Sequence, residues 1–151
     1  MSTATSPAGK IDTKHGATSY YTATSPIVSA TNDTDWTLVL VLENKPDIAT
    51  PATITVWWQN GGACSGGSVS GQIFATGSVT VPIAVDEQGI SLTVPKVGSS
   101  VSHPFVSGDL LCMSFENMGT IQQDQDIKAH ANTASISGTA GVSRLIGSFV
   151  H

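Results

Sequence analysis

Apolar and polar residues alternate along most of this chain, with the period of two that is typical of β-strands. Over residues 36–42 both alternating sets contain aliphatic side chains, which predicts a central strand covered on both faces. Further strands are predicted over 54–58, 69–75, 79–85, 90–94, 110–115 and 127–131, and the segment 134–150 supplies one or two more. No segment has the periodicity of a useful amphipathic helix.

Turn-forming residues separate these segments. Asn60-Gly61-Gly62 predicts a turn with positive φ, Gly77 a bulge or turn, and Pro82 an edge strand. About eight short strands at this spacing predict an all-β, antiparallel β-sandwich. We favour a jelly-roll-like topology over an immunoglobulin-like one, because Trp57 and Trp58 precede both cysteines instead of lying between them.

The first 30 residues differ from the rest in composition. They are rich in Ser, Thr, Ala and Pro, and the sequence Thr-Ala-Thr-Ser-Pro occurs at 3–7 and again at 22–26. We therefore divide the chain into an extended N-terminal arm, 1–30, and a β-sandwich domain, 31–151. An arm with so little to bury is ordered most easily on another subunit or partner. The alternative is an edge strand on its own domain.

Charge is scarce. Only 11% of residues are charged, and none lies between Ala49 and Val85. Since charged side chains normally protect exposed strands against association, this surface is expected to meet a partner. The net charge is −5 and the six basic residues are spread singly along the sequence, which argues against nucleic-acid binding.

Targeting signals and cysteines indicate where the protein is expected to be located. The N-terminus lacks the apolar stretch of a secretory signal, and no run of about 18 apolar residues predicts membrane insertion. We expect a chain made without a signal peptide that reaches a virion or extracellular surface, for example by cell lysis. Cys64 and Cys112 allow one disulfide; the alternative is two free thiols.

The sequence offers few candidate catalytic or metal-binding residues. The histidines have no metal-binding spacing, and no pair of titratable groups is spaced to act together, so we expect no metal, no cofactor and no enzyme activity. Trp57 shares a strand face with threonines, which predicts an exposed ring unless a long loop covers it. Trp57, Gln59, Asn60 and Trp36 are the predicted ligand or interface residues.

Two hypotheses follow. The first is a structural or assembly protein, a β-sandwich subunit of a homo-oligomer or of a larger protein scaffold. In composition and pattern the chain resembles small virion decoration or fibre-head sandwiches, which implies a virion decoration, capsid-associated or fibre protein. The second is a carbohydrate-binding, lectin-like module that uses an exposed Trp on a sheet face, with glycans as partners. The two are compatible.

Overall fold

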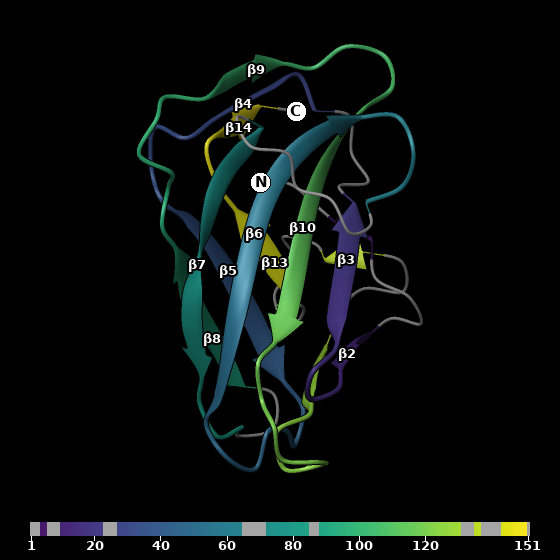
Figure 1. Cartoon of the computed structure of the whole chain (residues 1–151), viewed down its shortest axis with the longest axis vertical. Coiled ribbons are helices and arrows are strands. Elements are labelled where there is room, and N and C mark those ends of the chain that lie inside the picture. The colour runs from purple at the N-terminus through teal and green to yellow at the C-terminus, as the bar shows by residue number, and fades with distance from the viewer. Residues whose placement is uncertain are drawn as a thin grey trace.

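The computed structural model describes residues 4–5, 10–22, 27–64, 72–84, 88–130, 135–136 and 143–150. These residues form an all-β structure of several antiparallel sheets, arranged as a β-sandwich-like pair of layers (Figure 1). Among them no helix is long and apolar enough to cross a membrane.

Two sheets make the body of the molecule. The first contains, in order, β3 (Thr18–Thr22), β10 (Asp109–Asn117), β6 (Thr50–Asn60) and β7 (Ile73–Val81). The second contains β2 (Lys10–Thr13), β11 (Ile127–His130), β5 (Trp36–Leu42), β8 (Gln88–Val94) and β13 (Arg144–Ile146). Figure 1 shows β7, β6, β10 and β3 side by side, with β5 and β8 in the layer behind them.

The strand pairs are nested along the sequence. The pair β6–β7 is enclosed by β5–β8, then by β3–β10, then by β2–β11. The outermost pair joins β1 (Ala4–Thr5) to β12 (Ser135–Ile136). The four inner pairs fall alternately in the first and second sheets, and β1 and β12 form a separate two-stranded sheet.

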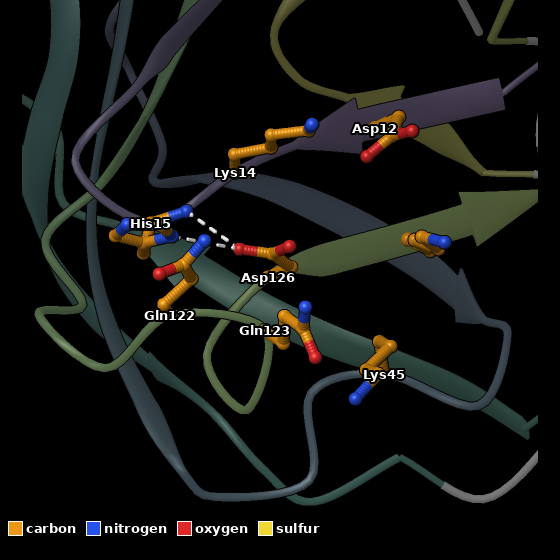
Figure 2. Close-up of a pocket in the computed structure, with 8 residues that line it drawn as sticks. Asp12, Lys14, His15, Lys45, Gln122, Gln123 and Asp126 are labelled. Carbon is orange, nitrogen blue, oxygen red and sulfur yellow. Dashed lines mark hydrogen bonds and ion pairs between the residues drawn. The ribbon is translucent and has the colours of Figure 1, made fainter.

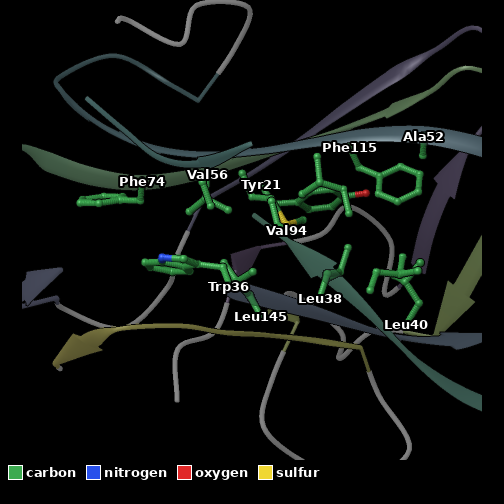
Figure 3. Packing of buried hydrophobic residues seen from close by; sticks show 14 of the residues in the cluster. Tyr21, Trp36, Leu38, Leu40, Ala52, Val56, Phe74, Val94, Phe115 and Leu145 are labelled. Carbon is green, nitrogen blue, oxygen red and sulfur yellow. The ribbon is translucent and has the colours of Figure 1, made fainter. Parts of the chain in front are cut away.

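The core lies between the two sheets, where both contribute buried aliphatic and aromatic side chains (Figure 3). Trp36 is fully buried in it and stacks on Phe74 and Phe149, at ring-centroid distances of 5.6 and 5.4 Å. Alternation explains the inner faces, because Leu38 and Leu40 of β5 share one face and are fully buried. The central position expected for residues 36–42 is confirmed, since β5 pairs with β8, β11 and β13.

A third, small sheet covers one end of the sandwich. It consists of β14 (Phe149–Val150), β4 (Ser29–Thr31) and β9 (Ser102–Pro104), at the top of Figure 1. Backbone hydrogen bonds extend it, from Val28 to the carbonyl of Val150 and from Phe105 to that of Val28. This end therefore joins three segments that are distant in the sequence.

Two expectations need correction. Residues 10–22 are not part of an extended arm: β2 and β3 are edge strands of the two main sheets, and Tyr21 is buried in the core. This matches the alternative of an edge strand on the chain's own domain.

Strands were also expected on both sides of Gly77, with a bulge or turn between them. Instead β7 runs straight through Gly77, where the missing side chain leaves room for Pro95. Residues 69–71 of the expected strand lie outside the described residues.

Candidate functional site

The sequence predicted that Trp57 is exposed, but the structure shows that it is buried. It does lie on the outer face of its sheet, but only 1% of it is exposed. It packs with Cys64 and Cys112, with Ile73 and Leu110 at the margin of this cluster. The segment that follows β6 folds back over the ring, so the alternative of a covering loop describes this site.

A disulfide between Cys64 and Cys112 ties that loop to β10, with the Cα atoms 5.6 Å apart. Gln59 adds a second tie. Its Oε1 accepts a hydrogen bond from the Trp57 indole at 3.0 Å, and its Nε2 donates to the carbonyls of Gly61 and Ala63. Gly61 and Gly62 take positive φ, as expected for the turn. The predicted ligand residues Trp57 and Gln59 therefore hold a loop in place.

Trp36 lies in a different cluster from Trp57. It is fully buried between the two sheets, whereas Trp57 lies on the outer side of the first sheet. In this conformation neither indole is available to stack on a sugar. The aromatic binding surface predicted from these two residues is therefore not present in the structure.

Asn60, the remaining predicted residue, belongs to a polar cluster beside the small sheet. Its Nδ2 donates to Asp109 at 2.7 Å, and the Val106 backbone N–H donates to the same carboxylate at 2.9 Å. Nε2 of His103 lies 2.7 Å from that carboxylate, and the imidazole stacks on Trp58 with the planes 6° apart. The Val106 and Asn60 donors are the main reason that the pKa of Asp109 is lowered.

A polar cavity of about 430 Å³ opens at the outer side of β2 and β11, beside the loop that joins β10 to β11 (Figure 2). Asp12 comes from β2 and Lys128 from β11, where the two are directly paired residues. Lys14 and His15 come from the turn after β2, and Lys45 from the loop after β5. The other lining residues are Gln122, Gln123 and Asp126.

Two buried amides shape the loop that carries Gln122 and Asp126. Asn117 donates to the carbonyls of Thr13 and Gln125 and accepts from the Gly119 N–H. Gln125 accepts from the N–H groups of Thr120 and Ile121 and donates to the carbonyl of Ala49. These bonds join the loop to itself, to the end of β2 and to the residue before β6, and so they fix the wall of the cavity.

Asp126 is the most strongly held acid of the cavity. The His15 backbone N–H and Nδ1 each lie 3.0 Å from its Oδ1. The backbone hydrogen bond is the largest reason that the pKa of Asp126 is lowered, and His15 and Lys14 act in the same direction. Asp126 therefore stays ionised in the cavity at neutral pH.

Within the described residues, the imidazoles of His15 and His103 lie against the carboxylates of Asp126 and Asp109. Neither His15 nor His103 receives a hydrogen bond from a hydroxyl or thiol there, and Cys64 is held in the disulfide. In the same part of the chain no group of three or more His, Cys, Asp or Glu residues is placed to hold a metal ion. What the cavity offers is hydrogen bonding and charge.

No family model, curated protein or solved structure matches this chain. The strand arrangement gives its class: it is an all-β protein with two facing antiparallel sheets.

Sequence reasoning missed the cavity. The lysines at 14, 45 and 128 are far apart in the sequence, and only the pairing of β2 with β11 brings two of them near each other. One available signal was the outward alternation of Asp12 with Thr13 and of Lys128 with Ile127, which places both charges on an outer sheet face.

Proposed function

We propose that this chain is a non-enzymatic jelly-roll subunit of a homo-oligomeric surface assembly, of the kind found in virion decoration, capsid-associated or fibre proteins. The nested strand pairs support the jelly-roll topology. The eight strands of these pairs are divided equally between the two main sheets, as in the jelly rolls of capsid and lectin domains, and β13 is an additional strand of the second sheet.

The single observation that carries the assembly role is the uncharged end of the sandwich. Val28, Val106 and Val150, here called the valine end, are 58, 65 and 57% exposed. They extend or adjoin the small sheet, and its segments 27–31, 97–108 and 146–150 contain no Asp, Glu, Lys or Arg. The neighbouring carboxylate of Asp109 accepts a hydrogen bond from the Val106 N–H, but its side chain is only 2% exposed. Exposed aliphatic side chains with so little exposed charge beside them are typical of surfaces that meet a partner.

The partner at the valine end is a second copy of the chain. Each copy carries a net charge of −5, so charged faces of two copies repel each other. From Ala49 to Gly108 the chain has only three charged residues, Asp86, Glu87 and Lys96. Copies approach with the least repulsion where charge is absent. Contacts with a larger scaffold can use the same surface.

A surface location agrees with the disulfide, because disulfides persist outside the cell and on virions and are rare in the cytosol. The lectin-like alternative relied on exposed aromatic rings. Because Trp57 and Trp36 are buried, these two residues no longer support it.

Light scattering on the full chain over a range of concentrations tests this role. We expect a defined oligomer for the natural sequence and monomers for Val106→Lys, because one lysine in each copy places like charges in the contact. Ile83→Lys is the matched control, since Ile83 is 60% exposed but lies outside the valine end. A natural chain that stays monomeric at every concentration contradicts the proposal. An oligomer unaffected by Val106→Lys contradicts the assigned surface.

A further inference from the structure

The end of the sandwich opposite the small sheet also exposes large apolar side chains. Ile48 lies between β5 and β6, Ile83 follows β7, and Met118 and Ile121 lie between β10 and β11. Figure 1 shows these three connections together at the bottom of the molecule. The four residues, here called the isoleucine end, are 39 to 60% exposed, and they are four of the nine exposed large apolar residues in the described part of the chain. Such a concentration is typical of an interaction surface.

Backbone hydrogen bonds hold the three connections together. The Ala84 N–H donates to the carbonyl of Pro46 at 2.9 Å, which joins the connection after β7 to the one after β5. The Ile48 N–H donates to the carbonyl of Asp124 at 3.2 Å, which joins the connection after β5 to the one after β10. The apolar side chains are therefore carried by one end of the molecule whose backbone is fixed.

The same connections and the residues next to them are strongly acidic. Segments 43–51, 82–88 and 116–126 contain seven of the eleven Asp and Glu residues of the chain and one of its six bases, Lys45. Lys45 is paired with Asp47. Seven acids and one lysine give these segments a formal charge of −6, compared with −5 for the whole chain. The isoleucine end therefore combines exposed apolar side chains with negative charge.

The lysines of the polar cavity do not reverse this charge. The cavity adjoins the same end, since Lys45 and Asp126 line it. Its other charged residues, Asp12, Lys14 and Lys128, add one acid and two lysines, and the total is then −5. A partner that approaches this end therefore meets a negative potential.

Charge decides the kind of partner. The isoleucine ends of two copies repel each other, and nucleic acids and anionic lipids are repelled for the same reason. A protein surface that has Lys or Arg around an apolar centre supplies the opposite charge and buries the exposed isoleucines. We propose that the isoleucine end docks on such a basic, apolar surface of a different protein. The flexible thioether of Met118 suits such a contact because it adapts to irregular surfaces. This surface is separate from the valine end, and the inference does not rest on the proposed assembly role.

Titration of the full-length chain with an amphipathic helical peptide of Leu and Lys, followed by NMR shifts of methyl groups, tests this inference. The peptide offers an apolar face flanked by positive charge. We expect shifts at Ile48, Met118 and Ile121 and none at Val106 of the valine end. Two control peptides carry Glu in place of Lys or Ser in place of Leu. Each should bind about tenfold more weakly or worse, because the first loses the opposite charge and the second loses the apolar contact.

Variants of the chain locate the contact. Ile48→Ser/Ile121→Ser removes two exposed apolar side chains and should weaken binding of the Leu/Lys peptide by about tenfold. Ile146→Ser is the matched control, since Ile146 is 40% exposed but lies on β13, and it should leave binding unchanged. Absence of binding, or equal binding of either control peptide, overturns the proposed partner. An equal loss in Ile146→Ser overturns the assigned surface. Urea unfolding checks that each variant keeps its fold, and light scattering on the same samples reports assembly independently.

Discussion

The indole Nε1 of Trp57 donates a hydrogen bond to Oε1 of Gln59 at 3.0 Å. From sequence both residues were expected to face a ligand. Instead the amide of Gln59 continues to the carbonyls of Gly61 and Ala63, and so links the buried ring to the loop that covers it. The contact makes this end of the first sheet a structural element, and its removal can be measured as lost stability.

Loss of the disulfide should destabilise the protein. Cys64 and Cys112 are 48 residues apart, and closing a loop of that size contributes about 2–5 kcal/mol. We expect Cys64→Ser/Cys112→Ser to lower the unfolding free energy by this amount in urea titrations. The natural chain in a thiol reductant should behave in the same way. Equal stability of the oxidised, reduced and serine forms would contradict the role given to this bond.

Trp57→Ala should cost about 3–5 kcal/mol of unfolding free energy, because it empties a buried site next to the disulfide. An exposed ring would have cost about 1 kcal/mol or less. Tyr20→Ala is the control: Tyr20 contacts Trp57 edge-on, yet is 37% exposed. A Trp57 variant as stable as the Tyr20 variant would show that the covering loop opens in solution.

Gly147→Ala should destabilise the C-terminal strand. A Cβ at Gly147 would overlap the indole ring of Trp36, and this buried ring cannot move away without breaking its stacks on Phe74 and Phe149. We expect a loss of about 3 kcal/mol in thermal or urea unfolding. Gly98→Ala adds a methyl group into open space and should be nearly neutral. Similar effects of the two variants would argue against the close packing on Trp36.

Acid should weaken the fold in a defined pH range. The pKa values of Asp109 and Asp126 are lowered in the folded state, mainly by the backbone N–H groups of Val106 and His15. A lowered pKa stabilises the fold above the unfolded value of about 4, and this stabilisation is lost as pH falls through the folded-state pKa. Urea unfolding between neutral pH and pH 2 should therefore show a decline below about pH 4.

Asp109→Asn should lower stability at neutral pH and flatten that acid decline, since the amide cannot ionise. Asp33→Asn removes a carboxylate from an exposed site and serves as the control. An unchanged acid profile in Asp109→Asn would contradict the role of the hydrogen bonds from Val106 and Asn60.

Local pattern alone determined the fold class and most strand positions. Alternation placed β5 and β10 because each strand has an inner face that must be apolar, and this requirement is written in consecutive residues. The turn at Gly61 and Gly62 was predictable for a similar reason, since positive φ is a property of single residues. Segments 10–22 were missed because few apolar side chains mark their strands, and they are held by pairing with β10 and β11.

Only the tertiary structure decided what each surface is for. Whether Trp57 is exposed depends on a loop closed by Cys112, and its own strand contains no information on that loop. The polar cavity depends on β2 pairing with β11, which brings Asp12 opposite Lys128 across more than a hundred residues of sequence. Strand periodicity is a local property, whereas burial and charge clustering arise from contacts between distant segments. The sequence by itself therefore determined the layers of this protein, and the packing of its loops and edges decided the candidate sites.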